Sequence, residues 1–464
     1  MKQIKIMMFS KRKIKRNLII IATSFLSIYL LISMYFFNHF FLHTEINGMN
    51  VSLKNYDKLS DIINDYIRNY ELKLIERDGE TEVITNQDIN LRHNNASIIS
   101  QAKHLQNPFL WIGSLWRNNR FYIKELFQYD RAVLDNKINQ LKCLNKKFTE
   151  PRNVDFIYTN GSYKIVKEID GNKINKTRFT NIVNQYISEG RRNLDLSLTH
   201  CYEEPIYKVG SKKTLITKNR LNQYVSAKII YRFGNASEQL NGTLLHQWLR
   251  VDENLDVTIS KEDIRNYIRA LGKKYDTVGI KREFQTSTGK TVELQGGLYG
   301  WKIDQNAETQ ALYKNINQAE VIEKEPIYLQ KAFSREGNEI GSTYIEINIT
   351  RQHLWFYKDG TLITQGAVVT GNPNRGNATV LGAYMVNYKQ KNATLTGADY
   401  EAKVTYWIPF FGNIGLHDAT WRHRFGGEIY LTRGSHGCVN APFYLVKTIF
   451  KYIEEGTPVI IYEE

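Results

Sequence analysis

Residues 417–440 read HDATWRHRFGGEIYLTRGSHGCVN, and no other stretch of the 464-residue chain gathers imidazoles, glycine and a thiol so closely. A free thiol has a pKa of about 8.5 and is mostly protonated at neutral pH, so a cysteine nucleophile needs an imidazole to accept its proton. Either His417 or His436 fits that role for Cys438. The stretch therefore predicts a cysteine nucleophile with a histidine base.

The residue before this cysteine is Gly437. Glycine lets the backbone bend tightly, so that neighbouring N–H groups converge on the oxyanion of a tetrahedral intermediate. We expect Cys438 to have a lowered pKa and to be alkylated faster than Cys143 or Cys201, which are predicted to be inert buried side chains.

The same histidines allow a second interpretation. His417, His423, His436 and Cys438 supply enough nitrogen and sulfur ligands for a zinc ion. No paired CxxC or HxxxH spacing supports a metal site. We therefore expect no metal and no cofactor.

His417, seventeen further residues and then SHGCVN together resemble the signature of the L,D-transpeptidases, also called the YkuD family. The longer run from His417 to Asn440 is similar to Gram-positive members. The resemblance implies a β-sandwich-like domain that performs acyl transfer on peptidoglycan stem peptides. It also implies that the modules upstream are peptidoglycan-binding domains.

The resemblance assigns roles position by position. Cys438 is the nucleophile and His417 the proton donor and acceptor, and Asp418 or a backbone group near it orients the imidazole. Ser435, His436 and Gly437 complete the catalytic set, with the N–H groups of Gly437 and Cys438 in the oxyanion hole. The predicted substrate-binding residues are Tyr406, Trp407, Arg433 and Asn440. One departure from the family is the segment Ala378 to Gly382, which lacks the common Thr-Pro.

The implied reaction is a transferase reaction that joins two stem peptides, one donor and one acceptor, by a 3-to-3 link with release of terminal D-alanine. Water as acceptor would make the protein an L,D-carboxypeptidase instead. A catalytically silent wall-binding scaffold is the remaining alternative. Tyr406, Trp407, Phe410 and Phe411 form either a hinged lid over the site or a plain strand and turn.

The catalytic domain is expected over residues 340–464. Ile345, Ile347 and Ile349 alternate with polar residues, and a turn follows at Asp359 and Gly360, which is typical of half-buried β-structure. Further β-rich segments and one helix near Leu445 predict a mainly β domain, an antiparallel sandwich with one late helix.

Two α+β modules are expected upstream, over 44–215 and 216–335. Gly171 to Ile174 corresponds to Gly300 to Ile303, and each precedes a helical apolar pattern. Glu-Pro-Ile-Tyr then occurs at Glu204 to Tyr207 and again at Glu325 to Tyr328. These marks indicate an internal duplication.

The N-terminus predicts one transmembrane helix, over 18–40, after a basic tail at 1–17. The uncharged run from Leu18 to Phe37 reaches across about 30 Å of hydrocarbon. Seven basic residues and no acidic ones precede residue 44, which places the N-terminus in the cytoplasm and the catalytic domain outside, facing the cell wall. A cleaved signal peptide is the competing interpretation, and no small-residue cleavage site follows the run.

The net charge is +15, and beyond residue 44 the 55 basic residues exceed the 47 acidic ones by eight. This excess is spread without a basic block, which favours anionic wall polymers as partners and argues against nucleic acid. The three cysteines are too few for a disulfide scaffold.

Overall fold

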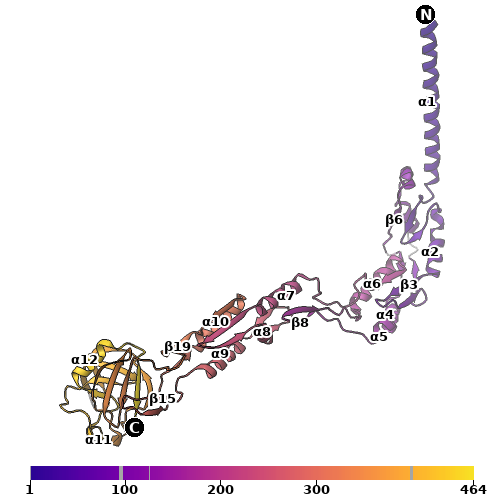
Figure 1. Cartoon of the computed structure of the whole chain (residues 1–464). Helices are drawn as coiled ribbons and strands as arrows, with labels where there is room; N and C mark the ends of the chain where they lie inside the picture. The colour runs from indigo at the N-terminus through magenta and orange to yellow at the C-terminus, as the bar shows by residue number, and fades with distance from the viewer. Residues whose placement is uncertain (1, 94–97, 125, 398–400) are drawn as a thin grey trace. The chain divides into compact units, whose positions relative to one another are not determined.

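The computed structural model of the chain describes residues 2–93, 98–124, 126–397 and 401–464 (Figure 1). The chain folds into two compact units. Unit 1 contains Met1–Asp155 and Ile165–Ser211, and unit 2 contains Phe156–Lys164 and Lys212–Glu464.

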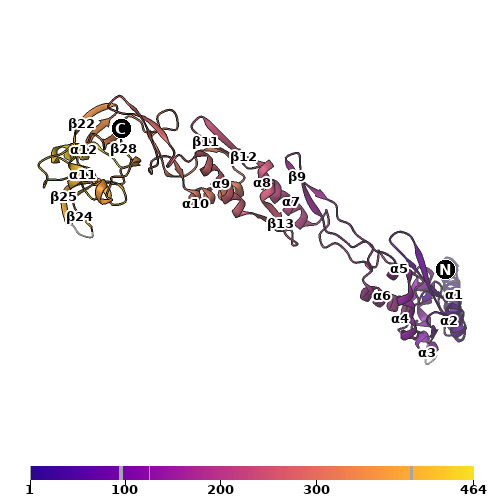
Figure 2. The same cartoon turned by 90° about the horizontal axis from the view of Figure 1, so that it is seen from below.

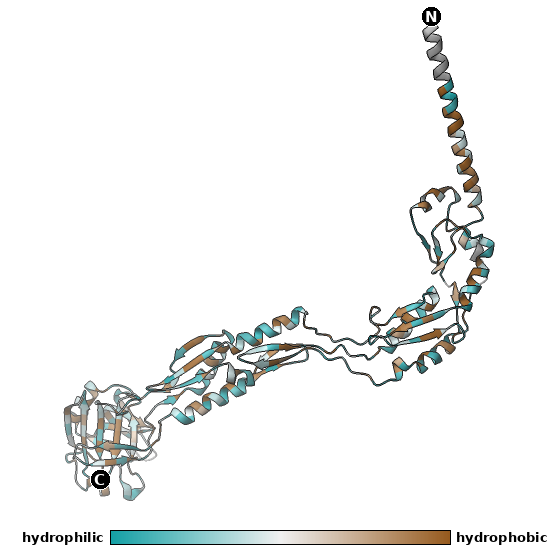
Figure 3. Ribbon diagram, turned by 45° about the vertical axis from the view of Figure 1, so that its right-hand side comes forward, coloured by the Kyte–Doolittle hydropathy of each residue, from teal (hydrophilic) through white to brown (hydrophobic). Residues whose placement is uncertain are grey.

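Unit 1 begins with the helix α1 (Lys2–Tyr35). Its stretch Lys13–Tyr35 has the length and composition of a membrane span or a signal sequence, and almost none of it is buried in the protein. In Figure 3 this part of α1 is predominantly coloured as hydrophobic. The predicted apolar run therefore forms one continuous helix from Leu18 as far as Tyr35, short of the predicted end of the span at residue 40.

The core of unit 1 is a three-stranded sheet with the order β10-β3-β4, in which β10 (Asn193–Asp195) lies parallel to β3 (Glu71–Ile75) and β4 (Thr81–Thr85) lies antiparallel to it. The helix α2 (Leu59–Arg68) buries Leu59, Ile63 and Ile67 at helical spacing, as the apolar pattern predicts. The remaining elements are η1 (Tyr56–Lys58), α3 (Ile98–Lys103), η2 (Pro108–Leu115), α4 (Arg131–Gln140), α5 (Lys142–Asn145), α6 (Lys176–Glu189), β1 (Thr44–Ile46), β2 (Met49–Asn50), β5 (Arg92–His93), β6 (Asn119–Phe121) and β7 (Phe127–Gln128). The strands β8 (Asp155–Thr159) and β9 (Ser162–Val166) form a two-stranded sheet that belongs mostly to unit 2.

The first part of unit 2 has a sheet with the same arrangement. Its order is β12-β11-β18, with β12 (Ala236–Leu240) antiparallel and β18 (Val321–Lys324) parallel to β11 (Lys228–Phe233). A hairpin joined by a parallel third strand thus occurs in both units, which agrees with the predicted duplication. Around it lie α7 (Lys212–Val225), α8 (Gly242–Trp248), α9 (Lys261–Tyr275), α10 (Gln305–Asn317), β13 (Leu249–Val251), β14 (Val257–Ile259), β17 (Lys302–Ile303) and β19 (Tyr328–Gln330).

The last part of unit 2 contains two sheets (Figure 2). The five-stranded sheet has the order β22-β21-β20-β28-β23, and the four-stranded sheet has the order β24-β25-β26-β27. Apolar side chains of both sheets and of α12 form one buried cluster. The bounds are β20 (Tyr344–Asn348), β21 (His353–Lys358), β22 (Thr361–Ala367), η3 (Pro373–Arg375), β23 (Gly382–Met385), β24 (Gln390–Thr396), β25 (Glu401–Phe411), β26 (Ile414–Asp418), α11 (Ile429–Arg433), β27 (Val439–Ala441), α12 (Phe443–Tyr452) and β28 (Pro458–Tyr462).

Two details of the predicted antiparallel domain are wrong. The strand β28 lies parallel to β20, and β27 lies parallel to β26, so both sheets are mixed. The predicted late helix is α12, but the short helix α11 precedes it. Parallel pairing needs no local turn signal, so hairpin patterns in the sequence do not reveal it.

A hairpin of β15 (Arg282–Gln285) and β16 (Thr291–Leu294) packs against the two-sheet part. Phe284 and Leu294 share a buried cluster with Ile460 and Tyr462. The backbone of Gly297 forms a bridge with Ala383 at the edge of the five-stranded sheet. The chain before residue 340 therefore supplies part of the packing of the domain that follows.

This packing can be tested with a matched pair of glycines. Gly297 and Gly289 have φ angles of +89° and +85°, but a Cβ at Gly297 would lie 2.0 Å from the carbonyl oxygen of Ala383, and a Cβ at Gly289 meets nothing within 4 Å. Both alanine variants bear the strain of positive φ, and Gly297→Ala adds a backbone clash of about 1–3 kcal/mol. We expect Gly297→Ala to lower the unfolding temperature further than Gly289→Ala in calorimetry. Equal temperatures would show that the contact does not hold the hairpin.

Candidate active site

One pocket of about 510 Å³ opens in the two-sheet part of unit 2. Five of the predicted site residues line it, namely His417, Ser435, His436, Cys438 and Asn440. They come from the end of β26, from β27 and from the turn before β27. The sequence stretch that predicts the chemistry therefore forms a single concave site.

Strand register brings these residues together. The strands β26 and β27 are parallel, with His417 opposite Asn440 and Leu416 opposite Val439. On the other side of β27, Asn440 and Val369 exchange backbone hydrogen bonds of 2.9 Å. The N–H of Ser435 donates to the carbonyl of Thr370 at 3.0 Å. The run Ser435 to Asn440 is thus held on both sides.

The turn before the nucleophile is held by Thr379. Its hydroxyl donates to the carbonyl of Gly437 at 2.7 Å and accepts from the N–H of Gly371 at 2.8 Å. Gly437 has a φ of +118°, a conformation that favours glycine. The segment Ala378 to Gly382, where the sequence departs from the family, therefore supports the turn directly.

Ser435 closes the same turn on itself. Its hydroxyl donates to the carbonyl of Cys438 and accepts from the N–H of Gly437 at 3.1 Å. This corrects the expectation that the Gly437 N–H faces an oxyanion, because in this structure it is already hydrogen-bonded. Ser435 therefore shapes the turn, and its hydroxyl oxygen accepts from the Gly437 N–H, one of the two N–H groups predicted for the oxyanion hole.

Cys438 is only 7% exposed and packs against Ala393, Val404 and Trp407. Its Sγ lies 3.6 Å from the carbonyl oxygen of Asn413. Burial raises the pKa of the Cys438 thiol, and a hydrogen bond from the backbone of Gly415 opposes that effect. The expected lowered pKa is therefore wrong for the resting state, in which the thiol is protonated.

His417 is buried as well, and its Nδ1 lies 2.9 Å from the backbone carbonyl oxygen of Asp418. Burial lowers the pKa of His417, while that carbonyl and the Asp418 charge act in the opposite direction. The Nδ1–H of the neutral ring donates to the carbonyl, which leaves Nε2 as an acceptor. The backbone of Asp418 thus orients the imidazole, whereas its carboxylate accepts from the N–H groups of Thr405 and Tyr406 at 2.9 and 2.7 Å.

Asn440 and Arg422 complete the surroundings of the imidazole. With its amide oriented to satisfy both neighbours, Asn440 donates to His417 Nε2 at 3.0 Å and accepts from Arg422 Nε at 2.8 Å. Arg422 lines the pocket, and burial lowers its pKa. Sequence reasoning missed Arg422, because a lone arginine in the run after His417 carries no motif of its own.

Cys438 and His417 share the pocket but do not touch through a hydrogen bond in the described part of the chain. Trp407 pairs with His417 across β25 and β26, and the ring centres are 5.9 Å apart. Trp421, a pocket residue that the sequence did not single out, also has its ring centre 5.9 Å from that of His417. Two indole rings therefore lie near the imidazole.

Other predicted residues lie away from the pocket. Tyr406 packs on Phe443 and Phe450 of α12, with ring centres 5.5 and 4.9 Å away. Arg433 is exposed on α11 and does not line the pocket. Trp407 lies behind Cys438, in its apolar cluster.

The lid interpretation of this aromatic segment is wrong. Tyr406, Trp407, Phe410 and Phe411 belong to the regular strand β25, which turns into β26 at Gly412 and Asn413. They form the plain strand and turn of the alternative.

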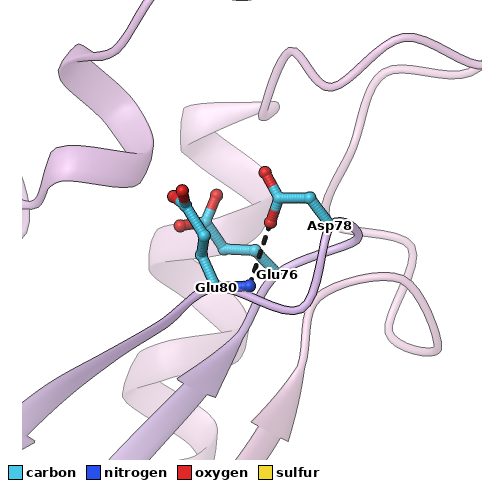
Figure 4. Close-up of side chains that lie close together, drawn as sticks. All are labelled: Glu76, Asp78 and Glu80. Atoms are coloured by element: carbon cyan, nitrogen blue, oxygen red, sulfur yellow. Dashed lines mark hydrogen bonds between the residues drawn. The ribbon is translucent and has the colours of Figure 1, made fainter.

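The structure does not bring the four zinc candidates together. In the described ranges, the group whose ligand atoms lie within 4.8 Å of one another is Glu76, Asp78 and Glu80 in unit 1 (Figure 4). The ammonium group of Lys146 lies 2.8, 3.0 and 2.9 Å from these three carboxylates. Lys146 therefore already pairs with all three carboxylates and compensates one of their three negative charges.

Cys143 and Cys201 are buried, and all three cysteines are unpaired in the structure. Burial raises the pKa of both thiols, and nearby Glu82 raises that of Cys143 further. Neither resembles an activated nucleophile.

Comparison with known proteins agrees with this site. The family model described as the L,D-transpeptidase catalytic domain (YkuD) matches residues 342–461. The model described as a putative peptidoglycan binding domain matches twice, at 82–195 and 211–322. No curated protein matches the chain significantly.

Solved structures of L,D-transpeptidases are also similar. A mutant L,D-transpeptidase of Enterococcus faecium is 32% identical, with 54% of this chain and 100% of that chain covered and a TM-score of 0.43. The catalytic domain from the same organism is 38% identical over 27% of this chain and 100% of its own length, with a TM-score of 0.25. An L,D-transpeptidase of Stackebrandtia nassauensis is 28% identical over 29% of this chain and 58% of its own, with a TM-score of 0.23.

These matches define the class, a peptidoglycan transpeptidase at the level of the family, and they confirm the resemblance seen in the sequence. The chain belongs to the L,D-transpeptidase family, with peptidoglycan-binding domains upstream of its catalytic domain.

The raised pKa of Cys438 gives a pH prediction. Because the thiolate is the reactive form, a raised pKa means that alkylation by iodoacetamide is slow at pH 7 and accelerates about tenfold per pH unit to above pH 8.5. Mass spectrometry of the modified peptide measures the rate, with Cys438→Ser as the control for labelling at Cys143 and Cys201. A rate that levels off below pH 8 would contradict a neutral resting thiol.

The hydroxyl of Thr379 gives a second prediction. Thr379→Val keeps the shape but leaves the Gly437 carbonyl and the Gly371 N–H without partners, at a cost of about 1–3 kcal/mol for each unmade bond. We expect lower stability in urea unfolding and a lower turnover number. Thr379→Ser keeps the hydroxyl and is expected to retain the stability and the turnover number of the wild type. A Thr379→Val variant with unchanged stability and turnover would show that the two hydrogen bonds of Thr379 do not hold the turn.

Proposed function

We propose that this protein is a membrane-anchored L,D-transpeptidase that forms 3-to-3 links between stem peptides through an acyl-enzyme on Cys438. The observation that carries the proposal is the shared pocket of Cys438 and His417, built on adjacent parallel strands. The family matches support it independently.

In the first half-reaction the hydrogen bond between Asn440 and His417 Nε2 breaks. Nε2 then accepts the proton of the Cys438 thiol. The thiolate attacks the carbonyl of the third stem residue, and the N–H of Cys438 stabilises the oxyanion. The intermediate collapses to a thioester. D-Alanine leaves as the amine and takes the proton from the imidazolium.

In the second half-reaction an amine of the acceptor stem attacks the thioester, gives its proton to His417 and forms the new amide. The thiolate leaves and recovers the proton. No nucleoside triphosphate is needed, because the energy of one peptide bond is kept in the thioester. A neutral thiol on Cys438 and a neutral imidazole on His417 suit this cycle, since the thiolate and the imidazolium form only when substrate covers the site.

The remaining pocket residues bind the donor stem in this proposal. Lys403 and Arg422 line the pocket, and among the lining residues that the structure describes Glu401 is the one with a negative charge. This charge balance favours the carboxylates of a stem peptide. His436 lies at the rim, and Asn440 and Ser435 hold the geometry, whereas Tyr406, Trp407 and Arg433 act from behind or beside the pocket.

The upstream parts position the enzyme at the wall. The apolar stretch of α1 acts as an uncleaved span, with the seven basic residues in the cytoplasm and the catalytic domain outside. The modules predicted at 44–215 and 216–335 bind peptidoglycan, and the catalytic domain at 340–464 is a sandwich-like pair of sheets. Holding the acceptor near the thioester favours transfer over hydrolysis.

Muropeptide analysis tests this function. We expect the wild-type chain, incubated with disaccharide tetrapeptides, to yield 3-to-3 dimers by mass spectrometry. Cys438→Ala should abolish product, and His417→Gln should lower the rate by about 10²- to 10⁴-fold because the proton acceptor is lost. Cys143→Ala, which changes another buried thiol, is the matched control and should retain activity.

The product distribution separates the alternatives. Stems that lose D-alanine without dimers would identify a carboxypeptidase. No loss of D-alanine from the folded wild-type chain, with wall binding intact, would identify a scaffold. Either result would overturn the transpeptidase proposal.

A further inference from the structure

A short segment of unit 1 exposes a series of large apolar side chains. The helix η2 (Pro108–Leu115) and the residue after it read PFLWIGSLW. Leu110 is 66% and Trp116 79% exposed, and Phe109, Ile112 and Leu115 are also exposed. Contiguous apolar surface of this kind on an otherwise polar domain marks an interaction site.

This segment lies directly beside the end of α1. The hydroxyl of Tyr29 donates to the carbonyl of Phe109 at 2.6 Å, and the ring centres of Tyr29 and Trp111 are 6.1 Å apart. Phe36 and Phe37, at and beyond the helix end, contact Trp111 and Phe109, with ring centres 6.1 and 5.8 Å apart. In Figure 3 the hydrophobic colouring continues from α1 onto the short helical segment beside its end.

The depth of these contacts identifies the partner. Tyr29 precedes the helix end at Tyr35 by six residues, which is about 9 Å along the axis at 1.5 Å per residue. It lies inside the stretch Lys13–Tyr35 that has the composition of a membrane span. If that stretch crosses a bilayer, a segment bonded to Tyr29 reaches the level of the outer leaflet.

We propose that residues 108–116 insert into the outer leaflet as an interfacial collar around the end of α1. The proposal rests on the membrane anchor of the proposed function. Tryptophan and phenylalanine are favoured where hydrocarbon meets headgroups, and basic side chains are attracted to anionic lipid phosphates. The adjoining Arg117 and Arg120 are exposed, and Arg120 also pairs with Glu45 at 3.2 Å. The lipid bilayer is therefore the occupant, because the exposed apolar surface is continuous with the span.

The collar gives unit 1 a second contact with the membrane. A single helix leaves the attached domain free to rotate about the helix axis and to tilt. A second inserted segment, fixed to α1 through Tyr29 and Phe36, removes that freedom. The collar thus orients unit 1 toward the bilayer surface.

Site-specific fluorescence on the full chain tests this insertion. In a Cys438→Ser background, Leu110→Cys is labelled with a nitrobenzoxadiazole probe and reconstituted in vesicles of phosphatidylcholine and phosphatidylglycerol. Leu198→Cys, also in unit 1 and 80% exposed, is the matched control, and Leu26→Cys reports on α1 itself. Lipid-borne nitroxides quench only probes that lie in the bilayer.

We expect a blue-shifted emission and strong quenching at positions 110 and 26, and neither at 198. A probe at 110 that behaves like that at 198, while position 26 is quenched, would overturn the collar and leave the anchor standing. If position 26 is not quenched either, the anchor fails and the collar fails with it.

Discussion

The catalytic pocket depends on the backbone pairing of β27. This three-residue strand lies between β26, its parallel neighbour, and the bridge to Val369. Because the register is fixed on both sides, His417 and Cys438 are placed in one pocket without a hydrogen bond between their side chains. A shift by one residue would turn Asn440 away from the imidazole and carry the thiol out of the pocket. The local order of the site is thus a property of the sheet.

Burial sets the chemistry of the site at rest. Desolvation raises the pKa of the thiol and lowers that of the imidazole, so both groups are neutral in the free enzyme. The Asp418 carbonyl and the Asn440 amide select the tautomer of His417, with the proton on Nδ1 and Nε2 accepting from Asn440. In the proposed mechanism the thiolate–imidazolium pair therefore forms only when a substrate changes the surroundings of the two groups.

The sequence predicted which residues share the pocket better than it predicted the strand pairing of the domain. The run SHGCVN and His417 identified the residues of the pocket, because glycine, thiol and imidazole are specific in type and spacing. The alternating isoleucines and the turn at Asp359 located β20 and β21, and the helix predicted near Leu445 is α12. The sequence did not predict the parallel pairings of β20 with β28 and of β26 with β27, since the paired strands lie far apart in the chain. The sequence did not predict the roles of Thr379 and Arg422 either, because each role depends on a neighbour that only the fold brings close. It also did not predict the direction of the pKa shift of the Cys438 thiol, because that direction depends on burial.

The hairpin β15–β16 has a consequence for how such chains can be recombined. Phe284 and Leu294 cover Ile460 and Tyr462, and the hydroxyl and N–H of Ser287 bond to the fully buried Glu346. The matched catalytic region begins at residue 342, so a crossover there would separate these partners. It would expose apolar surface and leave a buried carboxylate with the hydroxyl of Tyr462 but without the two hydrogen bonds from Ser287. An exchange of catalytic domains between such chains must therefore transfer the hairpin together with the two sheets. The segment that has to move as one piece begins before residue 342, where the family match begins.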